Sequence, residues 1–464
     1  MKKDIDIDPA TKQNLKRSIY DGVAFSVMSG ISENFFSPFA IFCGLSSKQI
    51  GSIMSLPHLT GNTIQLFISK YIAGRHNRKN YIAWLAFLQG LALITFILLL
   101  FNDIKPTFYH ILGTLIFYYV SGSLIGPIWS SFIGDVVPEN IRGRFFGDRN
   151  RVCGIIMFIS ILAGGSILYL SRKYRIEYYG FILIFCIGFI ARCVSTVFLI
   201  LSYDPEKEHL KASEKKTQKS ILIFFKDSRY KYFVNFLFFI SLINFCLHFS
   251  GPYFAVYMLK ELKLNYLQFT LISMTSILTQ FLTMKWWGKL SDHFGNYRFI
   301  VFCAFGIVIS PLLWLVGNST LYLLAIQCYS GFVWAGFLLC SVNYVFDALD
   351  HDDRPTGFPL YHFFGGFGIF IGATAGGFAA QYFEFHNNNY LVKLFGGYSF
   401  RPLFFISGML RLTIIAMLYK KFRELKFKSP TSPLAMFYRF SKLRPILGGA
   451  VDLISVYWKH KARK

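Results

Sequence analysis

The chain has 464 residues, of which 54% are hydrophobic and only 16% charged, and its mean hydropathy is +0.44. A soluble protein of this length would carry roughly a quarter charged residues, so the composition excludes a soluble enzyme or regulatory domain. The net charge of +24, from 48 Lys and Arg against 24 Asp and Glu, would point to nucleic acid in a soluble protein. Here the basic residues flank long apolar runs, as in membrane proteins, so no nucleic-acid partner is predicted.

The apolar residues form runs of about 20 residues or more, the length that an α-helix needs to cross a bilayer. They predict an all-α integral membrane protein with twelve transmembrane helices in two six-helix bundles, at 18–203 and 230–420. Residues 1–17 form an N-terminal tail, 204–229 a polar linker and 421–464 a basic tail. The expected spans are 18–44, 47–72, 80–101, 107–134, 148–170, 178–203, 230–259, 265–287, 298–317, 320–347, 358–383 and 400–420.

The placement of Lys and Arg predicts the orientation in the membrane. Basic residues gather in the first tail, in every second connection, in the linker and in the last tail, so both termini are expected in the cytoplasm. The last tail also has an apolar face, with Phe437, Leu447 and Trp458, and is interpreted as a segment lying on the membrane surface in contact with lipid. Short loops favour a bacterial inner membrane, and a monomer is expected.

The first span, 18–44, carries a carboxylate near its middle. Glu33 is costly there unless it is protonated, paired or facing water. These conditions suit a residue that takes up and releases a coupling proton. A fixed pair with a basic residue is the structural alternative. Asn34 follows directly and is a candidate for contact with a solute.

Polar residues recur in later spans. Arg192 and Arg411, in the sixth and twelfth spans, are interpreted as structural, by snorkelling or by pairing with an internal carboxylate. In the seventh span His248 can change its charge near neutral pH, so a Glu33–His248 proton relay is a hypothesis. A hydrogen-bonded packing histidine is the alternative. Glycines along the eleventh span, from Gly365 to Gly377, predict close helix packing.

The eight cysteines are scattered, with no spacing typical of a metal site or of a disulfide framework. The chain also lacks a Walker loop and a Gly-x-Ser-x-Gly elbow. No catalytic residue, metal or cofactor is therefore predicted.

The two halves repeat one another in weak matches that keep the same order at an offset of roughly 215 residues. The matches are Leu45–Ile50 with Leu264–Phe269, Ser37–Phe39 with Gly251–Tyr253, Asp135 and Arg142 with Asp347 and Arg354, and Gly188 and Arg192 with Gly408 and Arg411. Ser46 and Asn265, at the starts of the second and eighth spans, are both good N-cap residues. Parallel repeats of this kind place the solute between the halves near the middle of the membrane.

The segment Gly288–Arg298 resembles the cytoplasmic signature of the major facilitator superfamily, Gly-x-Leu-x-Asp-x-x-Gly followed by basic residues. Gly288, Asp292, Gly295 and Arg298 stand at its key positions. The segment Asp135–Arg144 resembles the family's loop after the fourth span, whereas the loop 70–79 keeps only the basic residues of the first copy of the signature. The chain is thus similar to this family over about residues 18–420.

The resemblance implies a secondary transporter that moves a small solute by alternating access. It also implies which spans line the central cavity, and on that basis the amides of Gln65, Asn244, Gln280 and Asn343 are better candidates for solute contact than that of Gln89. The charged residues near the signature loops are expected to form ion pairs that latch the cytoplasmic side: Asp135, Arg142, Asp292, Arg298, Asp347 and Arg354.

Glu33 and the lack of an ATP-binding feature favour protons as the coupling ion. A plain facilitator, a sodium-linked carrier, a channel, and a receptor or lipid-moving protein on the same fold are the alternatives that the sequence leaves open. It names neither the solute nor the direction of transport.

Overall fold

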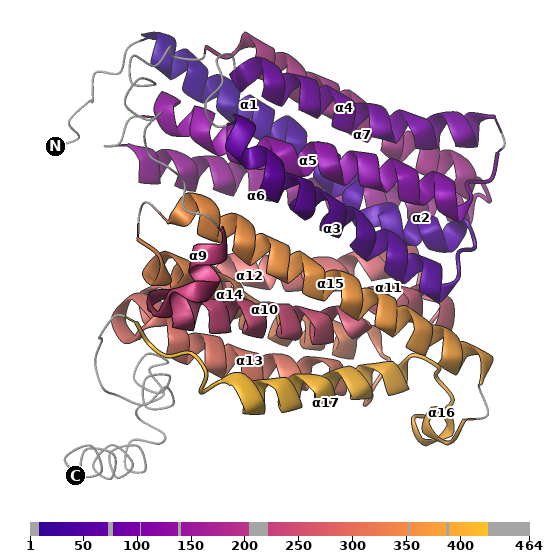
Figure 1. Ribbon diagram of the computed structural model, residues 1–464. Helices are drawn as coiled ribbons and strands as arrows, with labels where there is room; N and C mark the ends of the chain where they lie inside the picture. Colours follow the sequence, from indigo (N-terminus) through magenta and orange to yellow (C-terminus); the bar gives the residue numbers. More distant parts are fainter. Residues whose placement is uncertain are drawn as a thin grey trace, which may run out of the picture.

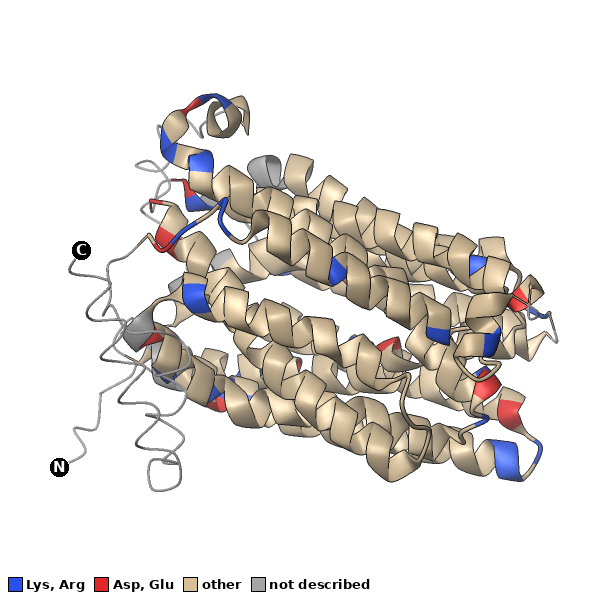
Figure 2. Cartoon of the chain, turned by 90° about the horizontal axis from the view of Figure 1, so that it is seen from below, with Lys and Arg blue, Asp and Glu red and all other residues tan. Residues whose placement is uncertain are grey.

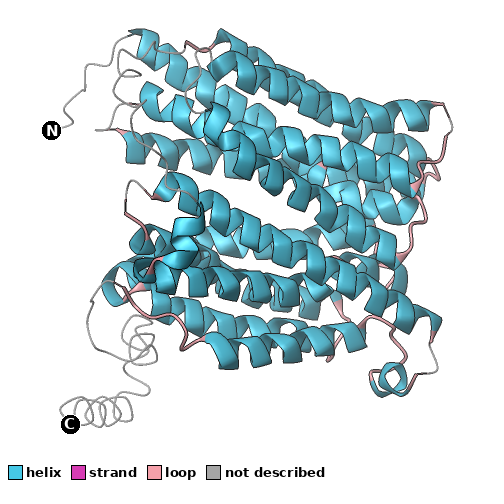
Figure 3. Ribbon diagram, in the orientation of Figure 1, coloured by secondary structure: helices cyan, strands magenta, loops and turns pink. Residues whose placement is uncertain are grey.

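A computed structural model describes residues 9–72, 78–102, 104–137, 141–203, 221–350, 353–386 and 389–425. Within these ranges the regular structure is entirely helical and contains no strand (Figure 3). The predicted all-α fold is confirmed. The basic tail after residue 425, with its expected surface-lying segment, lies outside the described residues, as do residues 204–220 of the linker and 73–77 of the first signature loop.

The first half of the chain forms one bundle, drawn from indigo to purple in the upper part of Figure 1. Its elements are α1 (Pro9–Ile31), η1 (Glu33–Phe35), α2 (Phe36–Phe42), α3 (Ser47–Ile72), α4 (Arg78–Phe101), α5 (Phe108–Val136), α6 (Arg142–Lys173) and α7 (Glu177–Leu201).

The second half forms a bundle of similar construction below it in Figure 1. Its elements are α9 (Ile221–Lys226), η2 (Ser228–Tyr230), α10 (Lys231–Ser250), α11 (Tyr253–Val256), η3 (Tyr257–Glu261), α12 (Tyr266–Phe294), α13 (Asn296–Leu313), α14 (Thr320–Ala348), α15 (Arg354–Phe385), α16 (Tyr390–Leu394) and α17 (Arg401–Leu418).

Each expected span coincides with one helix or with an interrupted one, and ten helical stretches of the described chain are long and apolar enough to cross a membrane. Helices α1 and α3 are not among the ten. Polar side chains such as Asp21, His58 and Gln65 lower their hydropathy. Figure 2 shows Lys, Arg, Asp and Glu gathered mainly at the two ends of the helices, which leaves an apolar middle as a bilayer requires.

The first long helix of each half is interrupted at the same place in the repeat. Helix α1 gives way to the 3-10 turn η1 before α2 resumes, and α10 gives way to α11 and then to the π-helical turn η3. Proline explains both interruptions, because Pro38 and Pro252 have no N–H and their rings collide with the carbonyl group four residues earlier. These carbonyl groups belong to Asn34 and His248, which the repeat makes equivalent.

The glycines of α15 let this helix approach its neighbours closely. A Cβ atom placed at Gly368, Gly372 or Gly376 would lie 2.0–2.2 Å from a backbone carbonyl oxygen of α10. On the other side, a Cβ at Gly377 would lie 3.0 Å from the Cα of Lys48 in α3. The predicted close packing of this helix is therefore confirmed, and α15 bridges the two bundles.

The two bundles are joined mainly at one end. Helix α1 begins and α17 ends at the left of Figure 1, here called the terminal end, and the opposite end is the distal end. Toward the distal end a single apolar cluster contains residues of both bundles, among them Phe36, Phe181, Tyr253 and Phe400. Toward the terminal end the buried apolar residues form two further clusters, one inside each bundle. The distal half is thus closed by shared packing.

The most extensive contacts between the bundles are those of α3 with α15 and of α6 with α12, and α11 also touches α2 and α3. Few of the described contacts at the distal end are polar. Lys260 Nζ donates to the carbonyl oxygen of Leu45 at 3.4 Å, and the Tyr266 hydroxyl donates to Glu177. A distal closure that is mostly apolar can open without separating many ion pairs.

Candidate functional site

Glu33 lies in η1, at the interruption of the first membrane crossing, and its side chain is half-buried. Ser29 Oγ donates a hydrogen bond to Glu33 Oε2 at 2.5 Å, and the Tyr118 hydroxyl donates to Glu33 Oε1 at 2.7 Å. Asn34 folds back onto the same segment, with Nδ2 3.3 Å from the carbonyl oxygen of Ser29. Two hydroxyl groups from α1 and α5 therefore orient the carboxylate.

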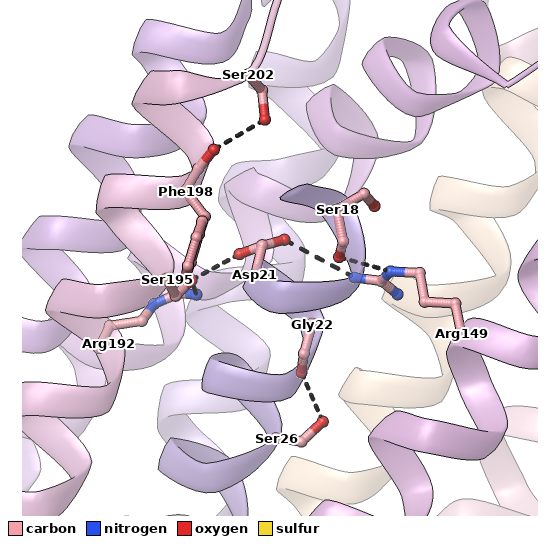
Figure 4. A network of polar contacts seen from close by, with 9 residues as sticks. All are labelled: Ser18, Asp21, Gly22, Ser26, Arg149, Arg192, Ser195, Phe198 and Ser202. Atoms are coloured by element: carbon pink, nitrogen blue, oxygen red, sulfur yellow. Dashed lines mark hydrogen bonds and ion pairs between the residues drawn. The ribbon is translucent and has the colours of Figure 1, made fainter. Parts of the chain in front are cut away.

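A second carboxylate of the same crossing, Asp21 of α1, holds together three helices (Figure 4). Ser195 Oγ of α7 donates to Asp21 Oδ1 at 2.7 Å and accepts from Arg192 Nη1 at 3.0 Å. On the other side Arg149 Nη2 of α6 lies 3.8 Å from Asp21 Oδ2, and Arg149 Nε donates to the carbonyl oxygen of Ser18 at 3.1 Å. The acid, with 5% of its surface exposed, is thus compensated by two guanidinium groups.

Aromatic rings cover both guanidinium groups. The Cζ atom of Arg149 lies 4.5 Å from the centre of the Trp129 ring, and that of Arg192 lies 5.1 Å from the centre of the Phe25 ring. Such contacts favour a desolvated cation, because the ring face carries partial negative charge. They help to explain how Arg192 is kept inside the bundle with 2% of its surface exposed.

The two carboxylates and the two arginines line one cavity of about 420 Å³ inside the N-terminal bundle. Its walls come from α1, η1, α4, α5, α6 and α7. The lining residues are Asp21, Phe25, Glu33, Ile82, Gln89, Tyr119, Gly122, Ser123, Ile125, Gly126, Trp129, Arg149, Arg192 and Leu199. We call this the N-bundle cavity.

Two polar atoms on the wall of the N-bundle cavity are buried and have no hydrogen-bond partner, Gln89 Oε1 and Arg192 Nε. Both residues are more than nine-tenths buried. An unpartnered buried polar group is costly, so such groups in a cavity indicate a place where a ligand or water completes the bonding. The family-based ranking had placed Gln89 below the other amides, whereas the structure puts it on the same cavity wall as Glu33.

His248 and Glu33 bond to different partners. His248 Nδ1 is 3.1 Å from the carbonyl oxygen of Asn244 in the same helix. Tyr119 and His58 lie between the two residues. Tyr119 is close enough to Glu33 to interact electrostatically, the centres of the His58 and Tyr119 rings are 4.0 Å apart with the rings tilted by 46°, and His58 interacts electrostatically with His248. Any relay from Glu33 to His248 would therefore pass through these two side chains rather than through a direct contact.

The candidate amides are half-buried and come from three bundle helices of the second half and one of the first. Asn244 Nδ2 donates to the carbonyl oxygen of Ile240 at 2.9 Å. Gln65 of α3, Gln280 of α12 and Asn343 of α14 are each half-buried. Of the sequence-predicted solute-contacting group, the structure joins Asn244 to His248 by a hydrogen bond and leaves Glu33 with Asn34 on the other bundle.

The signature segment of the second half makes a compact turn at the terminal end. Gly295 ends α12 with φ of +98°, a conformation that only glycine adopts readily. Glu424 follows α17 and its Oε2 accepts a hydrogen bond from the backbone N–H of Tyr297 at 3.0 Å. A Cβ at Gly295 would lie 2.1 Å from that same oxygen, so the turn requires glycine twice over. Burial raises the pKa of the Glu424 carboxyl group, although backbone donors oppose the shift.

The predicted gate residues whose side chains are described lie mainly within the second bundle. Asn296 Nδ2 donates to Asp347 Oδ2 at 2.6 Å, and Arg354 Nη2 donates to the carbonyl oxygen of Phe346 at 3.3 Å. Asp292 is exposed, Arg298 is half-buried, and Gly288 packs toward Leu339. The side chains of Asp135 and Arg142 lie outside the described part of the chain.

Asp21, His58 and Arg149 were not predicted from the sequence as site residues. Asp21 had a usable signal, since it is a second acid within the expected first span. Arg149, at the start of the expected span 148–170, had no distinguishing signal. In the described residues no group of three or more His, Cys, Asp or Glu side chains could hold a metal ion.

The model of the Major Facilitator Superfamily matches two stretches of the chain, residues 22–258 and 236–461. No curated protein matches this chain. Among solved structures, a mutant of the nucleoside transporter NupG has a TM-score of 0.65 at 12% identity, over 89% of this chain and 100% of that one. A bacterial homologue of the human lysosomal transporter Spinster, inward-facing and unoccupied, has a TM-score of 0.62 at 12% identity, over 92% and 100%.

A bacterial homologue of the iron transporter ferroportin, in an inward-facing state, also has a TM-score of 0.62 at 12% identity, over 89% of this chain and 100% of that one. Structural similarity at such low sequence identity establishes a common fold, and it does not identify the solute of this chain. The family model, by contrast, matches both halves of the chain, each over its helical bundle. The chain therefore belongs to the major facilitator superfamily, as a multi-pass membrane protein with a transporter fold rather than an enzyme.

Proposed function

We propose that the protein is a secondary active transporter that moves a small solute by alternating access, with Glu33 carrying the coupling proton. The observation behind this proposal is the hydroxyl pair around the carboxylate. Ser29 and Tyr118 both donate to Glu33, and a hydroxyl group can also accept a hydrogen bond. The site can therefore satisfy the ionised and the protonated acid in turn, which a coupling residue requires.

The packing of the two bundles supports alternating access. One shared apolar cluster closes the distal end, and two separate clusters lie toward the terminal end. Rearranging the distal contacts would convert this arrangement into one open on the other side, and a solute or proton that binds one arrangement better shifts the balance. With both termini in the cytoplasm of a bacterial cell, as the basic residues favour, the distal end would face outward.

The remaining candidates take supporting parts in this proposal. Asn34, Gln65, Asn244, His248, Gln280 and Asn343 would contact the solute along its path between the bundles. The tight turn at Gly295, tied to Glu424, would keep the terminal end of α12 and α13 rigid while the bundles rock. A monomer is sufficient, since one chain supplies both bundles.

The test is transport by the purified protein in liposomes that contain a pH-sensitive dye, under an inward proton gradient. Sugars, amino acids, organic acids and cationic drugs are added as separate mixtures. We expect one class to move protons inward with wild type. Glu33→Gln should abolish that proton flux and keep exchange of labelled solute, because glutamine still accepts from Tyr118 but cannot titrate.

Glu384→Gln is the matched control, since Glu384 belongs to α15 outside the N-bundle cavity lining. Its proton flux should equal that of wild type. Solute movement without proton flux in wild type, unchanged in Glu33→Gln, would make Glu33 structural and the protein an uncoupled facilitator.

A further inference from the structure

The N-bundle cavity has a charge balance that depends on a single proton. Arg149 and Arg192 contribute two positive charges, and Asp21 and Glu33 contribute two negative charges when both are ionised. Asp21 already has partners within the protein, since it accepts a hydrogen bond from Ser195 and forms an ion pair with Arg149. The described hydrogen bonds to Glu33, in contrast, come from neutral hydroxyl groups, and Arg192 acts on it only through space. Protonation of Glu33 therefore leaves the cavity with one net positive charge.

The two unpaired atoms belong to side chains that line the same cavity. Gln89 and Gly90 are consecutive in α4, and a Cβ at Gly90 would lie 3.3 Å from Arg192 Cγ, so the Gln89 and Arg192 side chains leave adjoining helices at the same level. Arg192 Nη1 is already engaged with Ser195, which leaves Nε as a donor. A guanidinium group matches a carboxylate in shape and charge, and the Gln89 oxygen would accept from a hydroxyl or amino group on the same ligand.

The rest of the wall is mostly apolar, apart from the hydroxyl groups of Tyr119 and Ser123. Phe25, Ile82, Ile125, Trp129 and Leu199 surround the polar groups, and the volume of about 420 Å³ lies in the range of small-molecule sites. A strongly hydrated inorganic anion would lose its water there without replacement, whereas an apolar body would fill the space. The site therefore suits a carboxylate head on a hydrocarbon or aromatic body.

We infer that the N-bundle cavity binds a small organic monocarboxylate with an apolar body and one hydrogen-bond donor, and that the anion enters together with a proton on Glu33. The carboxylate accepts from Arg192 Nε and the donor bonds to Gln89 Oε1. The added charges cancel, because one anion and one proton enter the same cavity. This inference rests on the proposed function for its transport step, while binding itself can be measured alone.

The test is calorimetric binding to the full-length protein in lipid nanodiscs at pH 6 and pH 8. The probes are 3-phenyllactate, 4-methylpentanoate and benzoate as monocarboxylates, 3-phenyllactamide as the neutral counterpart, phenylsuccinate as a dianion and phenethylamine as a cation. We expect 3-phenyllactate to bind best, more tightly at pH 6 than at pH 8, and the amide and the amine not to bind.

Gln89→Glu is the decisive variant, because it keeps the size of the side chain and adds a negative charge on the wall shared with Arg192, where it would repel the anion and compete for the guanidinium group. It should weaken 3-phenyllactate binding about tenfold or more, the effect of losing one charge-assisted hydrogen bond. Gln327→Glu, a matched change in α14 outside the cavity lining, should bind as wild type does. Glu33→Gln should bind at pH 8 as tightly as wild type does at pH 6.

Three results would overturn the inference: no binding by any monocarboxylate, equal binding by the amide, or no effect of Gln89→Glu. The fate of the proposed function is read separately in liposomes. Proton-coupled flux of another solute class would sustain that function and reject the monocarboxylate. Binding of 3-phenyllactate with the expected pH dependence, but without proton-coupled flux of any solute, would sustain the site and reject the coupled transporter.

Discussion

Arg192 and Arg411 are repeat-related arginines buried in equivalent helices of the two bundles, yet they stand in different surroundings. Arg192 of α7 reaches Asp21 through Ser195 and lines the N-bundle cavity. Arg411 of α17 donates to the carbonyl oxygen of Ile307 at 2.9 Å and to Ser250 Oγ at 3.1 Å. The first arginine is tied to a carboxylate, and the described hydrogen bonds of the second go to neutral groups.

The difference follows from two positions in the repeat. The offset that aligns Asn34 with His248 aligns Asp21 with Asn235 and Glu33 with Leu247. Asn235 Nδ2 donates to the carbonyl oxygen of Lys421 at 2.7 Å and is thus employed at the terminal end of its bundle. The bundles therefore share a framework of prolines, glycines and arginines, while both carboxylates of this constellation belong to the first. Proton chemistry and anion binding are accordingly expected in the N-terminal bundle.

The largest expected effect comes from making the two halves alike. Asp21→Asn copies the residue of the second bundle and removes the only carboxylate that faces both guanidinium groups of the network in Figure 4. Breaking a buried ion pair on one side costs about 3–5 kcal/mol, so the free energy of unfolding should fall by about that amount. Thermal unfolding in detergent measures it.

The reciprocal change, Asn235→Asp, is the control for Asp21→Asn. It lies near the exposed terminal end and should change stability by less than about 0.5 kcal/mol. An equal loss of stability in the two variants would contradict the view that the ionic network around Asp21 has no counterpart around Asn235.

A paired glycine substitution should separate packing from coupling. A Cβ at Gly188 of α7 would lie 2.0 Å from Ser32 Oγ, directly before Glu33, and a Cβ at Gly408 of α17 would lie 2.7 Å from Leu312 Cδ2. Overpacking of this kind costs about 1–3 kcal/mol, so both alanine variants should lose stability similarly. Only Gly188→Ala should reduce the number of protons moved per solute, measured with dye and radiolabel in the same liposomes. A lower ratio in Gly408→Ala would contradict the assignment of coupling to the first bundle.

The smallest effect is expected from Tyr118→Phe, which removes one donor to Glu33 and no charge. Ser29 still donates to the same carboxyl group, so the site keeps its geometry. Proton-coupled flux should therefore fall by no more than about threefold, the effect of losing one neutral hydrogen bond. Tyr344→Phe, in a buried tyrosine of α14 that donates to the carbonyl oxygen of Arg423, should leave the flux at the wild-type value. A loss as complete as that of Glu33→Gln would mean that the phenol is itself essential to proton transfer.

Much of the fold could be predicted from the sequence, because crossing a bilayer imposes long apolar runs on a chain of any function. The same apolar runs hide how the helices face one another. The interruption of the first crossing at 32–35 is caused by Pro38, and the repeat match between Pro38 and Pro252 was a signal for it. Hydropathy alone does not detect such an interruption and predicts one continuous helix. The N-cap prediction for Asn265 is confirmed, with its side chain accepting from the backbone N–H of Gln268.

The candidate site was less accessible to sequence reasoning, since it depends on which helices are neighbours. Glu33 could be singled out because an acid in an apolar run is unusual. Its relation to Arg192 and Gln89 required the contact of α1, α4 and α7, which no local pattern encodes. Arg192 was expected to be structural, and its bond to Ser195 is structural, but the same guanidinium also lines a cavity with an unpaired Nε. A single side chain serves both purposes.

The proline interruptions have a consequence for time scales. A helix that lacks one hydrogen bond of its ladder bends at that point at low cost, whereas a whole bundle must repack its interface to turn. Each half thus carries an elbow, at Pro38 and at Pro252, between a segment in the shared distal cluster and a segment that belongs to its own bundle. Bending of one helix at its elbow is expected to be faster than rocking of the whole bundles. The few residues beyond an elbow would therefore open and close the distal end many times during one transport cycle.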